Sequence, residues 1–172
     1  MIRFSFYISI VLAFVLTMSP SWSGEATVRL GFLISFSRFT TWPPHFFNEN
    51  ATMTICIVDD NRRFVESARV LDGHLVQGHK SKVILIQEPA TFCNVLFLPS
   101  ESQGRIEPYL DIARQNRTLT VSDRPSFLED GGMIQMEQSN GRYLFDINLG
   151  AIRQSGLYVG TNLLKLARSV KQ

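Results

Sequence analysis

The spacing of apolar residues along the chain predicts one long helix, followed by strands that alternate with helices. Val28, Phe32 and Phe36 lie four residues apart, with Leu33 and Phe39 beside them, so a helix over residues 25–39 would place one apolar stripe on one face. Later apolar runs are short, rich in β-branched and aromatic residues, and do not alternate with polar ones, which is typical of buried parallel strands. The predicted strands of this part are 54–58, 75–76, 82–86, 95–98 and 119–121, and the predicted helices between them are 62–71 and 105–115.

The last third of the chain predicts a different arrangement. Asn140-Gly141 joins two strand-like runs, 133–138 and 142–147, and this dipeptide is the strongest short-range signal of a β-hairpin. The other predicted elements are a short helix from Asp123 to the glycines at 131–132, a helical turn at 151–154, a strand at 157–159 and a closing helix at 162–170. This order predicts a single α/β domain with a mixed β-sheet flanked by helices, parallel at first and with an antiparallel hairpin toward one edge.

The first residues have the character of an export signal. Arg3 precedes an apolar run of fifteen residues, 4–18, and the small residues Ser21 and Ser23 follow. We expect residues 1–23 to be a signal peptide of the Sec type, cleaved after Ser23, which leaves residues 24–172 as the periplasmic domain. The alternative is an uncleaved membrane anchor, but the run is shorter than the roughly 20 residues that a spanning helix needs.

Composition and charge exclude several classes of protein. The chain of 172 residues is 45% hydrophobic and has 17 Lys plus Arg against 15 Asp plus Glu, which excludes a disordered chain and disfavours a protein that binds nucleic acid through phosphate contacts. Two cysteines are too few for a zinc finger or a disulfide-dense scaffold. An exported compartment permits a disulfide between Cys56 and Cys93, and the alternative is two buried reduced thiols.

Asp59-Asp60 is the most enzyme-like feature, because it follows a predicted buried strand, where open α/β sheets bind ligands. The pair resembles the magnesium-binding carboxylates of receiver domains, but the later strands are not followed by the aspartate and lysine that such chemistry needs. Helix capping by Asp60 or Asn61 is the simpler interpretation. The three histidines have no partners at metal-ligand spacing, and G-x-S-x-G is absent. We therefore expect no catalytic residue, metal or cofactor.

Two surfaces are candidates for binding a partner. The first is an aromatic group beside two prolines after the first helix, and its members are Trp42, His45, Phe46 and Phe47. Aromatic residues are enriched at interface hot spots, although these could instead cover the end of the helix. The second is the closing helix, with Leu163 and Leu166 toward the core and Lys165, Arg168 and Lys171 on a cationic face.

Seven segments, taken together and in order, resemble the YfiR-type family of periplasmic regulators. They are residues 32–43 (FLISFSRFTTWP), 55–60 (ICIVDD), 93–97 (CNVLF), 119–123 (LTVSD), 131–134 (GGMI), 145–149 (FDINL) and 163–167 (LLKLA). The resemblance covers about residues 28–170. It implies a regulatory protein, not an enzyme, that represses a membrane-bound diguanylate cyclase through the cyclase's periplasmic domain and so lowers cyclic di-GMP.

The same resemblance implies partners and site residues. An outer-membrane lipoprotein would sequester the regulator, and the regulator would form a homodimer with no membrane insertion after cleavage. It also implies a disulfide, which here maps onto Cys56 and Cys93. Contacts in the family cluster at the stretch matching 145–152, so the expected partner-binding residues are Phe145, Asp146, Ile152 and Trp42. The alternative function is a periplasmic small-ligand sensor that uses the cleft beyond Asp59-Asp60 and serves a different membrane receptor.

Overall fold

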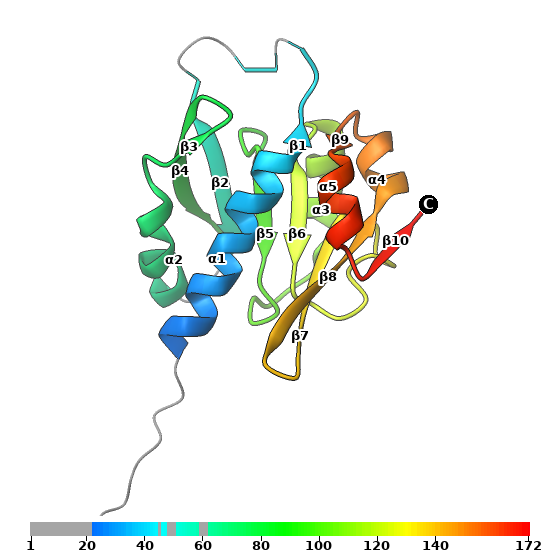
Figure 1. Cartoon of the computed structure of the whole chain (residues 1–172). Coiled ribbons are helices and arrows are strands. Elements are labelled where there is room, and N and C mark those ends of the chain that lie inside the picture. Colours follow the sequence, from blue (N-terminus) through cyan, green and yellow to red (C-terminus); the bar gives the residue numbers. More distant parts are fainter. Residues whose placement is uncertain (1–21, 45, 48–50, 59–61) are drawn as a thin grey trace, which may run out of the picture.

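A computed structural model describes residues 22–44, 46–47, 51–58 and 62–172 (Figure 1). The helices are α1 (Trp22–Phe39), α2 (Arg62–Ala68), the 3-10 helix η1 (Arg69–Leu71), α3 (Glu107–Gln115), α4 (Leu149–Gln154) and α5 (Thr161–Leu166). The strands are β1 (Thr40–Thr41), β2 (Met53–Val58), β3 (Leu75–Val76), β4 (His79–Ile86), β5 (Val95–Leu98), β6 (Leu119–Ser122), β7 (Ile134–Ser139), β8 (Arg142–Asn148), β9 (Tyr158–Val159) and β10 (Ser169–Lys171). The predicted leader lies outside the described residues, apart from its last two.

One mixed sheet organises the domain, with the strand order β10-β8-β7-β6-β5-β2-β4-β3. Strands β4, β2, β5, β6 and β7 run parallel to one another, whereas β3 pairs with β4, and β8 with β7, in the antiparallel direction. Asn140 and Gly141 form the hairpin turn with φ values of +50° and +74°, the left-handed conformations that a type I′ turn requires. The predicted fold class is therefore confirmed. A separate two-stranded antiparallel sheet joins β1 to β9.

The two faces of the sheet carry separate cores because side chains alternate along each strand. In Figure 1, α1 and α5 cross the front of the sheet and α3 lies behind it. The front core includes Phe36 of α1, Phe97 of β5 and Leu163 of α5, whereas the rear core includes Cys56 of β2 and Leu110 of α3. The central strands β2 and β5 are buried on both faces, which explains their continuous apolar sequences.

Helix α1 forms as predicted, but only part of the expected apolar stripe is buried. Phe36 and Leu33 are fully buried and Phe32 is half-buried. The prediction is wrong for Val28 and Phe39, which are 43% and 40% exposed, and the buried side also includes Leu30. Apolar residues lie all round this helix, and their spacing alone could not select the face that meets the sheet.

Two further predictions are wrong. Residues 123–130 form a series of turns around the buried Phe127 instead of a short helix, although Gly131 adopts the expected left-handed conformation with φ +93°. The closing helix ends at Leu166, which is 71% exposed and not part of the core. Ser169–Lys171 instead forms β10, parallel to β8, and the predicted cationic helix face does not exist.

Candidate functional site

The four residues expected to bind a partner come from three regions, and all are buried. Phe145 and Asp146 lie on β8, Ile152 lies on α4, and Trp42 follows β1. Their exposed fractions are 6%, 7%, 0% and 5% in that order. Their role in partner binding stays a prediction. Because they are buried, a partner would contact exposed residues packed around them and not these four side chains.

Asp146 fastens the C-terminal strand to the sheet. Its Oδ1 accepts hydrogen bonds from Arg168 Nε at 3.0 Å and Ser169 Oγ at 2.7 Å, and its Oδ2 accepts one from Arg168 Nη2. Arg168 Nη2 also lies 2.7 Å from Glu137 Oε2 on β7. The hydrogen bond from Arg168 is the main reason that the pKa of Asp146 lies below its ordinary value. Because Ser169 pairs with Asp146 in the β8–β10 ladder, this carboxylate holds β10 in register.

Phe145 points to the opposite face of β8 and connects that strand to α1. Its ring centroid lies 5.1 Å from that of Phe36 and 6.0 Å from that of Phe32. Phe32 also lies 6.1 Å from the ring of Tyr143, two residues earlier on β8. These four rings form one aromatic cluster between the hairpin and α1. A substitution at Phe145 would therefore alter the packing of α1.

Trp42 and Ile152 are anchored in the front core. The indole Nε1 of Trp42 donates a hydrogen bond to the backbone oxygen of Arg117 at 3.1 Å, and its ring packs on Phe46 and Phe47 with centroid distances of 6.4 and 5.7 Å. Phe46 and Phe47 are half-buried, and the ring of Phe47 stacks on that of His79 of β4 with a centroid distance of 4.3 Å. His45, the other member of the predicted group, lies outside the described residues.

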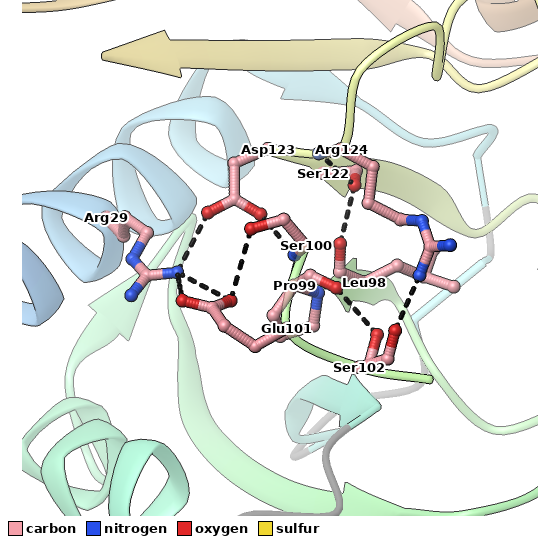
Figure 2. Close-up of polar contacts among 9 residues, drawn as sticks. All are labelled: Arg29, Leu98, Pro99, Ser100, Glu101, Ser102, Ser122, Asp123 and Arg124. Carbon is pink, nitrogen blue, oxygen red and sulfur yellow. Dashed lines mark hydrogen bonds and ion pairs between the residues drawn. The ribbon is translucent and has the colours of Figure 1, made fainter. Parts of the chain in front are cut away.

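A charged cluster that the sequence did not predict lies where β5 and β6 end (Figure 2). Arg29 of α1 places its Nη1 2.8 Å from Asp123 Oδ2 and 3.1 Å from Glu101 Oε1. The Arg29 guanidinium also lies over the ring of Phe64, 4.9 Å from its centroid. The sequence held one indication of this site. Arg29 lies four residues before Leu33, so it shares the buried side of the helix, where an arginine needs carboxylate partners.

Burial and charge act in opposite directions within this cluster. Burial would lower the pKa of the Arg29 guanidinium, but attraction to Asp123 and Glu101 outweighs it and raises that pKa. Burial also raises the pKa of the Asp123 carboxyl, although Arg29 and the backbone N–H of Ser100, 2.6 Å from Oδ1, act against it. The guanidinium is already bound to these carboxylates, so the cluster attaches α1 to the strand ends and does not present a free cation to a substrate.

Hydrogen bonds between the two neighbouring loops complete this edge. Ser122 Oγ donates to the backbone oxygen of Leu98 at 2.5 Å and accepts from the N–H of Arg124 at 2.9 Å. The Arg124 side chain donates to the backbone oxygen of Ser102 at 2.7 Å, as Figure 2 shows. The loops after β5 and β6 are thereby fixed to each other. Asp59-Asp60, predicted for the same edge after β2, lies outside the described residues.

Cys56 and Cys93 form a disulfide, with their Cα atoms 5.7 Å apart. Both residues are buried on the rear face of the sheet. The bond links β2 to the segment that enters β5, next to it in the sheet. Of the two interpretations that the sequence left open, the structure contains the disulfide.

The described residues contain no cluster of metal ligands. Within 22–44, 46–47, 51–58 and 62–172, no three His, Cys, Asp or Glu residues lie close enough to hold a metal ion. The same residues include no helix with the length and apolar character that crossing a bilayer requires. One described cavity, which Thr120, Met133 and Ser155 help to line, measures about 10 Å³ and has room for a single water molecule.

The chain is similar to one protein family and to a solved structure. A family model described as YfiR/HmsC-like matches residues 26–168. A solved structure, that of a conserved domain protein from Vibrio cholerae O1 biovar eltor strain N16961, is similar with a TM-score of 0.54 and 15% sequence identity. That similarity covers 70% of this chain and 55% of the Vibrio protein. At this identity it supports the fold alone.

Proposed function

This chain belongs to the YfiR/HmsC-like family, and we propose that it represses a membrane-bound diguanylate cyclase by binding the periplasmic domain of that enzyme. The family is one of periplasmic regulators in cyclic di-GMP signalling and is not enzymatic. The observation that carries the proposal is the extent of the family match, which runs from residue 26, within α1, to residue 168, just before β10. Repression would lower cyclic di-GMP in the cytoplasm.

The proposed compartment is supported by the disulfide. Disulfides persist in oxidising compartments such as the bacterial periplasm and are rare in the cytosol. The Cys56–Cys93 bond is buried and joins neighbouring strands, as expected of a structural cross-link. We propose that residues 1–23 direct export and are then removed.

Repression by binding requires that the regulator prefer one conformation of the cyclase. A ligand shifts a conformational equilibrium only by the difference in its affinity for the two states. The regulator therefore needs a rigid surface that fits the inactive state. The hydrogen bonds from Arg168 to Asp146 and the aromatic cluster around Phe145 make the hairpin β7–β8 rigid in this way.

We propose that the segment 142–154 contributes to this surface, with Phe145, Asp146 and Ile152 acting as supports. Exposed residues beside them would make the contact, among them Leu144, which is 36% exposed and lies two residues before Asp146 on the same face of β8. A homodimer and an outer-membrane lipoprotein that sequesters the regulator are part of the same proposal.

Gene deletion and complementation in the native host test this function. Deletion should raise intracellular cyclic di-GMP, measured by mass spectrometry, and the wild-type gene should restore the lower level. The matched control is a version that lacks residues 2–23, because a protein held in the cytosol cannot reach a periplasmic domain. Unchanged cyclic di-GMP on deletion, or full complementation by the cytosolic version, would contradict the proposal.

A further inference from the structure

Helix α1 has one long side that no other described element covers. Gly31 and Arg38 are exposed on this side, together with Val28, which is 43% exposed, and Phe39, which is 40% exposed. Phe32 is half-buried at its margin. Residues three, four and seven apart share a side of a helix, so Val28, Gly31, Phe32, Ser35 and Phe39 form one surface, here named the α1 face.

The α1 face is unusually apolar for the solvent side of a surface helix. Such a side is normally lined by charged and polar residues. Among the described side chains of α1, Arg38 alone is both charged and exposed. The neighbouring elements β9 and α5 add Tyr158, 65% exposed, and Leu166, 71% exposed. Half of the exposed large hydrophobic residues in the described chain thus lie on α1, β9 and α5. Grouped apolar exposure of this kind marks an interaction surface.

The end of the α1 face continues onto the small sheet. Gly160 donates its N–H to the backbone oxygen of Phe39 at 2.8 Å, and a Cβ on Gly160 would lie 4.0 Å from the Phe39 ring. Thr41 pairs with Tyr158 in the β1–β9 ladder. Thr41 and Tyr158 lie opposite each other in this ladder, so their side chains point to the same side. Phe39, at the end of α1, and Tyr158, on β9, are thus exposed on two elements that contact each other at Gly160.

The α1 face also rests on the segment proposed above to bind the cyclase. The ring of Phe32 packs against Phe145 and Tyr143 of β8. Support from beneath by buried rings fixes the position of this part of α1. A partner that engages the hairpin side of the molecule could reach the α1 face without a gap between the two surfaces.

Charge indicates the chemistry of the occupant. The exposed charged side chains described on α1 and α5 are Arg38 and Lys165, both cations, and neither forms an ion pair with a carboxylate among the described residues. Two copies of this face would place like charges together, whereas a partner with carboxylates beside its apolar residues would complement it.

We propose that the α1 face receives an α-helix from the periplasmic region of the cyclase, with an apolar contacting side flanked by carboxylates. The proposal rests on the function proposed above. A helix fits because Gly31 lies near the middle of the face, and a Cβ built there would meet nothing within 4 Å. The backbone of α1 is therefore open to close approach by a second helix.

Gly31→Glu is the test variant, because it adds bulk and a negative charge to the α1 face without a clash inside the domain. Glutamate has a higher helix propensity than glycine, so the melting temperature should not fall. The matched control is Gln115→Glu, which places the same residue at an exposed position of α3, on the other side of the sheet. Both genes are returned to the deletion strain, and cyclic di-GMP and co-purification of the cyclase are measured.

Gly31→Glu should weaken cyclase binding by about tenfold or more and leave cyclic di-GMP at the level of the deletion strain. Gln115→Glu should behave as the wild type. Normal repression by Gly31→Glu, with normal folding, overturns the inference but leaves the proposed function intact. If the wild-type gene itself does not lower cyclic di-GMP, the proposed function fails and the inference fails with it.

A photoreactive residue in place of Gly31 identifies the occupant in the periplasm. A cross-link to a periplasmic helix of the cyclase supports the inference. A cross-link to a second copy of this chain, with a matching loss of dimers for Gly31→Glu in analytical ultracentrifugation, would assign the face to self-association and overturn it. Sedimentation of the purified wild type with vesicles of anionic lipid, abolished by Gly31→Glu, would assign it to the membrane and also overturn it.

Discussion

Removal of the Cys56–Cys93 disulfide should lower the free energy of unfolding by about 3–4 kcal/mol. The bond closes a loop across 37 residues, and in the chain-entropy model a loop of this size restricts the unfolded chain by roughly that amount at 25 °C. The double variant Cys56→Ala/Cys93→Ala also loses the packing of two buried sulfur atoms, so its loss should lie at or above the upper end of the range.

Urea denaturation followed by far-UV circular dichroism measures this effect. With a slope of about 2 kcal/mol per molar urea, the midpoint of the double variant should fall by about 2 M or more. Reduction of the wild type with dithiothreitol should lower its midpoint by roughly 1.5–2 M, which corresponds to the cross-link alone. The same reductant should leave the double variant unchanged, which is the control for direct effects of the reductant.

Two results would refute this reasoning. A loss of less than about 1 kcal/mol would mean that the unfolded chain is not restricted by the cross-link to the extent that its loop length implies. An equal response of the double variant to dithiothreitol would mean that the reductant acts elsewhere.

Three other substitutions test particular contacts. Gly132→Ala should destabilise the protein by about 2–3 kcal/mol in urea, because the added Cβ would lie 2.2 Å from a ring carbon of the fully buried Phe127; a neutral effect would show that the ring can move aside. Arg29→Met should cost about 3 kcal/mol, since it leaves Asp123 without its cation, and an unchanged melting temperature would contradict a structural role for this cluster. The wild type should lose stability relative to Asp146→Asn as the pH falls below about 4. The reason is that a carboxyl whose pKa is lowered by folding stabilises the protein only while ionised, and parallel curves of unfolding free energy from pH 6 to pH 3 would refute the role given to that carboxylate.

The strands and the hairpin could be predicted because their signals are local. Residues of β2 and β5 are buried on both sides, so their sequences are continuous apolar runs whatever lies around them. Asn140-Gly141 defines its turn through its own backbone preferences. Such local signals can be recognised without knowledge of the rest of the fold.

The C-terminal segment was predicted wrongly because distant residues decide its structure. Leu163, Leu166 and Val170 have the spacing of a helix, and the sequence pattern alone favours that interpretation. The pairing of β10 with β8 and the bonds from Arg168 to Asp146, 22 residues away, select a strand instead. Tertiary contacts outweigh a weak helical preference over so short a segment.

The charged cluster was missed for a related reason. Arg29 lies 72 and 94 residues from its two carboxylate partners, so its contacts depend on how α1 crosses the ends of β5 and β6. The candidate residues Phe145 and Asp146 came from a family resemblance, which gave their identity but not their burial. Their packing beneath α1 and β10 could only be found in the structure.

The most direct test of the central proposal is the activity of a purified cyclase in the presence of this protein. The membrane cyclase that co-purifies with it is placed in lipid nanodiscs, and conversion of GTP to cyclic di-GMP is followed as the purified regulator is added. We predict a saturable fall in the rate, with no fall when the regulator is added to the isolated cytoplasmic catalytic domain. A rate that stays constant at saturating regulator, or equal inhibition of the isolated catalytic domain, would contradict regulation through the periplasmic domain.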